Sequence, residues 1–285
     1  MPALLRELKK FYAHSARAHL PWRATHDPYR ILVSEVMLQQ TQVDRVAPYY
    51  ARFIKKFPTA KKLAQASLAE VLGEWQGLGY NRRGKFLWEA SKQIAAVGVP
   101  KKGVGVVFIS PFLGTSRQLS TDFLETLPGV GPYTARAIAT FAYNRTEVFI
   151  ETNIRTVFFF HFYSGVLQKT RIDDKELLLM VAEALKKSKM QPREFYAALM
   201  DYGSHLKRQG VRLNSKSRHY AKQSKFKGSA RELRGALLRE LLKGPKTSAQ
   251  LRKDLSRKKG EVDVELARLA REGMIKRQGS RLAVA

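Results

Sequence analysis

The sequence Leu-Pro-Gly-Val-Gly occupies residues 127–131, between two stretches with the apolar spacing of helices, 121–126 and 133–143. Its two glycines allow the backbone to turn tightly and to expose its N–H groups. The following helix presents the positive end of its dipole at the same place, which favours a bound phosphate. The stretch therefore predicts two helices joined by a phosphate-binding turn, the alternative being an ordinary tight turn between helices.

The chain on both sides of this turn is predicted to be mostly helical. Apolar residues recur at three- and four-residue spacing over residues 4–11, 31–38 and 63–75, and prolines separate the segments at intervals suited to helices of ordinary length. Residues 100–120 interrupt the pattern with glycine, serine and β-branched residues. We interpret them as a loop or short hairpin inserted between helices.

The charge of the chain indicates a polyanionic partner. Its 52 Lys and Arg residues outnumber 24 Asp and Glu residues, a formal net charge of +28. The sequence pI of about 10.4 exceeds the value of roughly 9 that marks nucleic-acid-binding domains. The basic residues are spread along the whole chain, which favours nucleic acid over a membrane surface as the partner.

The 285 residues contain no cysteine. Disulfides, thiolate zinc sites, iron–sulfur clusters and a cysteine nucleophile are thereby excluded. No stretch approaches the roughly 18 apolar residues of a membrane span, and the first ten residues lack the features of a cleavable signal. We expect a cytoplasmic protein without membrane contact.

The C-terminal part has the pattern of a separate module. Residues 207–230 are basic and polar, as in a DNA-facing strap or an interdomain linker. Helical spacing follows, and a strand-turn-strand pattern ends the chain; these segments are 232–242, 248–255, 262–272 and 274–284. This order is typical of a winged helix-turn-helix, whose second and third helices would approach a duplex. The alternative is a solvated basic helical tail.

Glu35 stands in the apolar run 31–38. A carboxylate there is costly unless it is paired or protonated. Burial would raise its pKa and make it a candidate general acid near neutral pH, the alternative being a solvent-facing residue on an amphipathic helix. Residues 39–42 are expected to continue this helix with amides and a hydroxyl, which suit contacts with base edges.

Four motifs carry a resemblance to a known family: Leu-Pro-Trp-Arg at 20–23, Ser-Glu-Val-Met-Leu-Gln-Gln-Thr-Gln-Val at 34–43, Trp-Gln-Gly-Leu-Gly-Tyr at 75–80 and Leu-Pro-Gly-Val-Gly-Pro-Tyr-Thr at 127–134. In this order they resemble the A/G-mismatch adenine glycosylase (MutY) family of the helix-hairpin-helix DNA glycosylases. The similarity is close over roughly residues 20–165 and loose over 190–206.

The resemblance implies roles for four residues. Glu35 would protonate the extruded purine at N7, and Glu151 would stabilise the sugar cation, with Asn153 orienting either Glu151 or the attacking water. Glu151 replaces the family's aspartate and is one methylene longer, so it could instead only cap the helix expected over 153–163. Tyr133 stands where bifunctional relatives carry a Schiff-base lysine, which implies a monofunctional enzyme with little or no AP lyase activity.

The resemblance also implies which residues touch DNA. Trp22 and Arg23 would form part of the base pocket, Gln40 would intercalate, and Leu78 and Tyr80 would wedge in at the opposite base, filling the gap left by base extrusion. The full set of expected DNA contacts is Gln39, Gln40, Thr41, Leu78, Gly79, Tyr80, Gly129, Val130 and Gly131.

The chain departs from the family at two places. The family's cluster cysteines fall at Lys207, Asn214, Ser217 and Gln223. We therefore expect no iron–sulfur cluster, no metal and no cofactor, a monovalent cation at the hairpin being the one alternative. Packing and hydrogen bonds, including those of His205, His219 and Tyr220, would brace the loop instead. A family Gln or Glu that contacts the extruded adenine falls at Ala197, so one hydrogen-bonding contact that would select the excised base is missing.

The sequence thus predicts an all-α, two-lobed helix-hairpin-helix DNA glycosylase with a small C-terminal winged-helix-like module. The predicted regions are a six-helix barrel lobe (21–135), a second helical lobe (1–20 with 136–227) and the module (228–285). We expect a monomer in the nucleoid that hydrolytically removes adenine opposite 8-oxoguanine or guanine from double-stranded DNA. The alternatives are a glycosylase for thymine or uracil opposite guanine, and a DNA-binding protein without catalysis.

Overall fold

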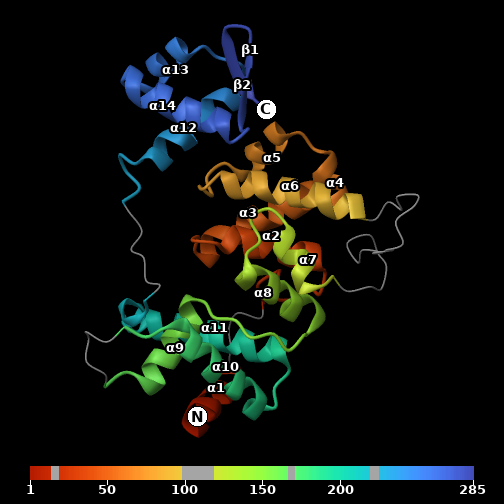
Figure 1. Ribbon diagram of the computed structural model, residues 1–285, viewed down its shortest axis with the longest axis vertical. Coiled ribbons are helices and arrows are strands. Elements are labelled where there is room, and N and C mark those ends of the chain that lie inside the picture. Colours follow the sequence, from red (N-terminus) through yellow and green to blue (C-terminus); the bar gives the residue numbers. More distant parts are fainter. Residues whose placement is uncertain (14–18, 98–118, 166–170, 219–224) are drawn as a thin grey trace. The chain divides into compact units, whose positions relative to one another are not determined.

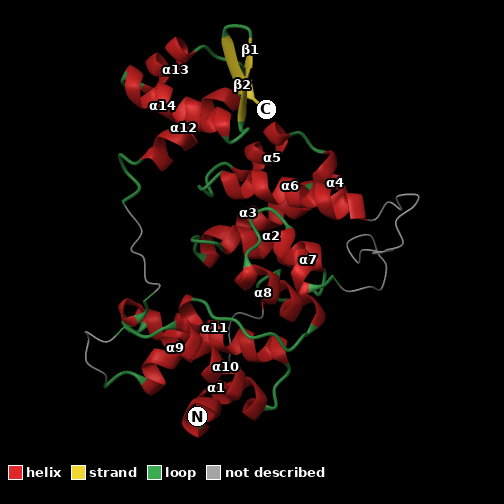
Figure 2. Ribbon diagram, viewed as in Figure 1, coloured by secondary structure: helices red, strands yellow, loops and turns green. Residues whose placement is uncertain are grey.

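The computed structural model describes residues 1–13, 19–97, 119–165, 171–218 and 225–285, and these are mostly helical (Figures 1 and 2). The predicted all-α class is confirmed. The loop or hairpin expected at residues 100–120 lies almost wholly outside the described residues. None of the described helices combines the length and apolarity needed to cross a membrane.

The elements follow the chain in this order: α1 (Pro2–Ala13), α2 (Pro28–Leu38), α3 (Val43–Lys56), α4 (Ala60–Gln65), α5 (Leu68–Trp75), α6 (Arg82–Val97), α7 (Thr121–Thr126), α8 (Pro132–Tyr143), α9 (Thr152–Phe162), α10 (Asp174–Ser188), α11 (Pro192–Arg208), the 3₁₀ helix η3 (Asn214–Lys216), α12 (Ala230–Leu242), α13 (Ser248–Leu255), α14 (Lys259–Arg271), β1 (Ile275–Gln278) and β2 (Arg281–Val284).

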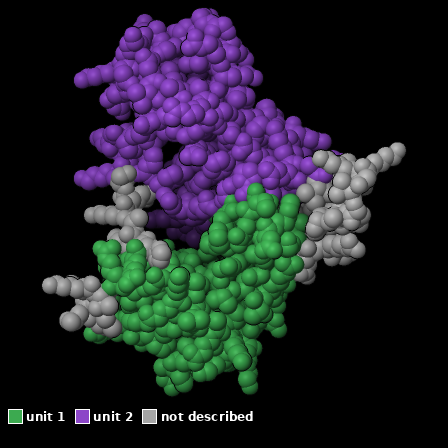
Figure 3. Space-filling view, viewed as in Figure 1, with its two compact units in different colours: residues 1–35, 118–126, 130–222 green, residues 36–117, 127–129, 223–285 purple. Residues whose placement is uncertain are grey.

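The chain divides into two compact units (Figure 3). Unit 1 comprises residues 1–35, 118–126 and 130–222, and unit 2 comprises residues 36–117, 127–129 and 223–285. The three-part division expected from the sequence groups the residues differently and stays a prediction.

Unit 1 is centred on helix α11, which packs against α9, α1, α8 and α10. Phe149 and Tyr196 are buried and their rings stack with centroids 3.8 Å apart. Helices α9 and α11 approach so closely that a Cβ at Gly203 would lie 2.2 Å from the carbonyl oxygen of Asn153. Only glycine permits this approach, which brings the start of α9 against the C-terminal half of α11.

In unit 2, the apolar segment 63–75 forms two helices. Helix α4 ends at Gln65, and the next begins with a capping box in which Ser67 and Glu70 satisfy each other's backbone N–H groups. The serine and glutamate therefore start a new helix where apolar spacing alone suggests continuity.

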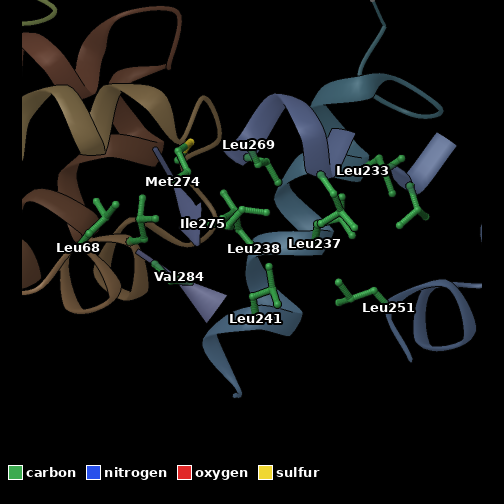
Figure 4. Close-up of a cluster of buried hydrophobic side chains, with 13 residues drawn as sticks. Leu68, Leu233, Leu237, Leu238, Leu241, Leu251, Leu269, Met274, Ile275 and Val284 are labelled. Atoms are coloured by element: carbon green, nitrogen blue, oxygen red, sulfur yellow. The ribbon is translucent and has the colours of Figure 1, made fainter. Parts of the chain in front are cut away.

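The C-terminal module has the predicted order of three helices and a hairpin. Strands β1 and β2 pair antiparallel, Ile275 opposite Val284, and Lys246 adds a bridge to Leu282. The buried leucines of α12, α13 and α14 form one hydrophobic cluster with Leu68 and Leu72 of α5 (Figure 4). The module therefore shares its core with α5, which contradicts the alternative of a solvated tail.

We predict that Leu237→Ala, at the fully buried centre of this cluster, lowers the free energy of unfolding by about 2–5 kcal/mol. Removing the leucine side chain costs burial and leaves a cavity. Urea denaturation followed by circular dichroism measures the change. Leu179→Ala, at a residue that is 75% exposed, should change stability by less than about 0.5 kcal/mol; equal losses in both variants would contradict the assignment of this core.

Candidate active site

Glu35 lies on α2 and is buried, with 8% of its surface exposed. Its neighbours in sequence from Ile31 to Val33 are fully buried as well. The Tyr133 hydroxyl donates a hydrogen bond to Glu35 Oε2 at 3.2 Å. The structure therefore places the carboxyl inside the protein, as the apolar run indicates, and excludes the solvent-facing alternative.

Burial raises the pKa of Glu35 to about 7. The hydrogen bond from Tyr133 and the positive charge of Arg23 lower this pKa, and the carboxylate of Glu151 raises it. The rise in pKa caused by removing the carboxylate from water exceeds the lowering by Tyr133 and Arg23. Glu35 can therefore hold a proton near neutral pH and deliver it to a base.

Tyr133 stands at the start of α8, directly after Pro132, whose fixed φ suits the first helical position. Its ring packs edge-on against Phe149. Burial first, and then the carboxylates of Glu35 and Glu151, raise the pKa of Tyr133 well above its ordinary value. The phenol therefore stays neutral and serves as a hydrogen-bond donor to Glu35.

Glu151 is the N-cap of α9. Its Oε1 accepts hydrogen bonds from the backbone N–H groups of Asn153 at 2.7 Å and Ile154 at 2.9 Å, and its Oε2 accepts one from Asn153 Nδ2 at 3.2 Å. Glu151 therefore caps the helix, while its catalytic role stays a prediction. A cap and a catalytic charge are compatible here, because the helix N-terminus stabilises a carboxylate whose charge still acts on Glu35 and Tyr133.

Lys207 is a member of this cluster that the sequence did not identify. Its Nζ donates a hydrogen bond to Asn153 Oδ1 at 2.8 Å, so the amide links the lysine to Glu151. Burial lowers the pKa of Lys207, and the nearby Glu151 partly offsets that effect. No residue pattern signals this contact, because Lys207 and Asn153 are 54 residues apart in the chain and the close approach of α9 to Gly203 is a feature of the structure.

Arg23 is held near these groups. Its guanidinium forms an ion pair with Asp201 at 3.1 Å and lies over the ring of Phe141. Arg193 fixes the segment by donating to the carbonyl oxygen of Arg23 at 2.6 Å. Trp22 is buried beside Arg23 in sequence, and its place in a base pocket stays a prediction.

The loop that would hold a cluster in the resembling family is braced by hydrogen bonds. Lys216 is buried and donates to the carbonyl oxygen of Tyr163 at 2.8 Å, and Asn214 donates to the Thr156 hydroxyl at 3.0 Å. Of the three residues expected to brace it, His205 packs against the ring of Phe11. His219 and Tyr220 lie outside the described residues, and Ala197 is buried on α11.

Residues 39–42 do not continue helix α2, which ends at Leu38. The cause is Arg83, a second residue that the sequence did not identify. Its buried guanidinium donates to the carbonyl oxygens of Val36, Met37, Gln39, Leu78 and Gly79 and to the Thr41 hydroxyl. Because Arg83 occupies the last carbonyls of α2, the chain turns at Gln40, whose φ is 56°.

The expected DNA contacts differ in exposure. Gln40, Gly129 and Gly131 are exposed, whereas Leu78 and Val130 are buried. Gly129 has a left-handed φ of 77°, and a Cβ there would lie 2.9 Å from the side chain of Phe86. Gln39 Nε2 donates to the carbonyl oxygen of Gly129 at 3.3 Å. All these contacts with DNA stay predictions. Because Leu78 is buried, its side chain would have to move out of the protein core to wedge between bases.

Comparisons with known proteins agree with this geometry. Residues 33–204, more than half of the chain, match the model of the HhH-GPD superfamily of base excision DNA repair proteins. The adenine DNA glycosylase of Mycolicibacterium smegmatis is 39% identical over 202 residues, which cover 70% of this chain and 61% of that protein. The adenine DNA glycosylase of Buchnera aphidicola is 32% identical over 194 residues, covering 68% of this chain and 50% of that protein.

A solved thermostable thymine-DNA glycosylase has a similar fold. Its TM-score is 0.55 at 22% identity, and the match covers 71% of this chain and 85% of that chain. The chain spans one half to three fifths of the length of the two curated relatives above. The resemblance to adenine glycosylases seen in the four sequence motifs is thereby confirmed.

We predict that Glu35→Gln gains stability relative to the wild type as the pH rises from about 4.5 to 7. The folded state keeps the Glu35 proton up to a pKa of about 7, against 4.5 unfolded. When the wild type folds above pH 4.5, Glu35 must either keep a proton or be buried with its charge. Either way, the free energy of unfolding falls, by about 3 kcal/mol at pH 7 and above. Glutamine carries no charge at any of these pH values. Denaturant unfolding of both proteins at several pH values measures the difference.

The control for this prediction is Glu125→Gln, at an exposed residue of α7. It should follow the wild-type dependence on pH. A Glu35→Gln protein whose stability difference is flat between pH 4.5 and 7.5 would show that Glu35 is not buried in its charged form.

Proposed function

Because the chain belongs to the HhH-GPD superfamily of base excision DNA repair proteins, we propose that it is a DNA glycosylase that removes adenine from mispairs with 8-oxoguanine or guanine. The observation that carries the proposal is the buried Glu35 carboxyl, hydrogen-bonded to Tyr133 and poised to protonate near neutral pH. The likeness to two adenine DNA glycosylases over two thirds of the chain supports the choice of base.

In the proposed reaction, an extruded adenine accepts the Glu35 proton at N7. The bond between the base and the sugar C1′ then breaks, and its electron pair leaves with the neutral base. Water adds to C1′ and loses a proton to the Glu35 carboxylate, which restores the acid. The products are free adenine and an abasic site.

Glu151 is proposed to stabilise the positive charge that develops on the sugar. Its carboxylate is held by the backbone N–H groups at the start of α9, so no reorganisation is needed when the charge appears. Asn153 orients this carboxylate, because its side-chain amide is hydrogen-bonded to both Glu151 and Lys207. The additional methylene of glutamate, compared with aspartate, is accommodated without loss of the cap.

We further propose that the enzyme is monofunctional. A lyase needs an amine that attacks C1′ and forms a Schiff base, and the position after Pro132 holds the phenol of Tyr133. The nearest described amine in the cluster, that of Lys207, is engaged with Asn153. The proposed substrate is a damaged or mismatched duplex, to which the net charge of +28 attracts the enzyme.

We predict that the protein releases adenine from duplexes containing adenine opposite 8-oxoguanine or guanine, leaving a site that breaks only after hot alkali. Glu35→Gln should lower the single-turnover rate at least 100-fold, because it removes the proton donor, while duplex affinity stays within a few-fold. Denaturing gel electrophoresis with and without alkali gives both readouts.

Duplexes with thymine or uracil opposite guanine complete this experiment. Cleavage at those bases alone would replace adenine by a pyrimidine as the substrate, and no cleavage at any base would leave a DNA-binding protein without catalysis. Strand breakage without alkali would contradict the monofunctional proposal.

The single-turnover rate should fall about tenfold per pH unit above pH 7, because the acid form of Glu35, whose pKa is about 7, disappears there. The Tyr133 hydrogen bond lowers that pKa, so Tyr133→Phe should move the fall to higher pH. Rates at saturating enzyme between pH 5.5 and 9 test both statements. A profile that is flat in this range would show that Glu35 does not supply the proton.

A further inference from the structure

Unit 2 contains a cavity of about 1140 Å³ that none of the proposed catalytic residues lines. One wall is the segment Gln76–Arg83 with the turn after α2, and the other is the part of α12 from Arg231 to Arg239. Its volume exceeds the roughly 300–1,000 Å³ of small-molecule pockets. A macromolecular ligand therefore fits this cavity better than a metabolite.

The lining of the cavity is strongly basic. It holds two carboxylates and seven arginines, which are Arg45, Arg82, Arg83, Arg231, Arg234, Arg239 and Arg257. Some are paired, as Arg257 is with Glu232 at 3.6 Å. Arg239 is exposed and, in the described part of the chain, has no carboxylate within ion-pair distance. The lining therefore carries more positive than negative charge, which favours a polyanionic ligand.

Aromatic side chains lie among these charges. Tyr80 has a left-handed φ of 49°, a conformation that residues other than glycine rarely adopt. Its ring is flanked by the guanidinium groups of Arg83 and Arg231, 5.3 and 5.0 Å from the ring centre. Phe226 also lines the cavity and is 58% exposed. Arginines beside aromatic rings are typical of grooves that bind single nucleic-acid strands.

Gly235 is the third observation. It stands inside helix α12 and lines the cavity, although glycine destabilises a helix interior relative to alanine. A Cβ at Gly235 would meet nothing within 4 Å, and its φ is not left-handed. Neither packing nor backbone conformation requires this glycine. Close approach of a ligand to the helix backbone would require it.

We propose that this cavity is a groove for a DNA strand, formed jointly by residues 77–80 and helix α12. The exposed arginines of the lining pair with phosphates, whereas the buried Arg83 holds backbone carbonyls. Tyr80 and Phe226 lie against bases, and Gly235 lets the strand approach α12. The inference rests on the proposed function, since a repair enzyme must hold more DNA than the extruded nucleotide. It assigns the DNA-facing surface of the C-terminal module to its first helix, whereas the sequence pattern points to the second and third.

The first test uses a matched pair of glycines. Gly235→Gln puts a side chain into the groove, and Gly73→Gln places the same side chain on α5, where a Cβ also meets nothing within 4 Å and which does not line the cavity. Neither variant should lower the melting temperature, because glutamine is the better helix former. Only Gly235→Gln should weaken binding of a fluorescein-labelled undamaged duplex, at least fivefold by anisotropy.

The second test uses a matched pair of arginines on α12 and α14. Arg239→Gln should reduce the slope of log affinity against log salt by about 0.9, the value for one lost phosphate contact. Arg271→Gln removes an exposed arginine from the third helix of the module, outside the groove, and should leave the slope unchanged. The full chain and the same labelled duplex are used throughout.

Wild-type affinity and salt slope in both groove variants would overturn the proposal. A reduced slope in Arg271→Gln alone would overturn it as well, because DNA would then lie on α14. Excision assays on the same proteins separate the two hypotheses. If the wild type excises no base while the groove variants bind DNA weakly, the proposed function is wrong and the groove proposal holds. If the wild type excises adenine while the groove variants bind DNA as tightly as the wild type, the groove proposal is wrong and the proposed function holds.

Discussion

Removing one carboxyl group from water is the constraint on which the proposed chemistry depends. Glu35 is carried on a helix whose other residues are almost all apolar, so its position follows from the burial of its neighbours. The fold then adjusts the acidity with a few contacts: Tyr133 donates a hydrogen bond, Arg23 adds a positive charge and Glu151 a negative one. Acid strength and charge stabilisation are thus built from the ends of three helices, α2, α8 and α9.

Unit 2 is organised by a different interaction, the buried guanidinium of Arg83. It caps the end of α2 and holds the Gly-Leu-Gly-Tyr turn by donating hydrogen bonds to backbone carbonyls and one hydroxyl, and it also lies over the rings of Trp75 and Tyr80. Planar and always charged, an arginine can satisfy several carbonyls that a lysine could not reach together. The two left-handed residues nearby, Gln40 and Tyr80, follow from this arrangement.

The sequence predicted most of the helices, because local signals decide them: α7 and α13 have the expected bounds, set by apolar spacing and polar caps. It also predicted the burial of Glu35, since a charge within an apolar run has few other places to go. Arg83 and Lys207 escaped prediction. Most of their partners are carbonyls and an amide about 40 to 55 residues away in the chain, and no pattern of residue types encodes such contacts. The same arginine explains why α2 ends before the amides at 39–42.

The hydrogen-bonded loop around Asn214 and Lys216 has a consequence for the life of the protein in a cell. A thiolate-held cluster has to be assembled, supplied with iron and protected from oxidants. Here an ammonium group and an amide brace the loop as soon as the chain folds, and with no cysteine in the sequence there is no thiol for peroxide to convert to sulfenic or sulfinic acid. The bracing of this loop therefore depends on hydrogen bonds between ordinary side chains and the backbone, and requires neither iron nor a thiol.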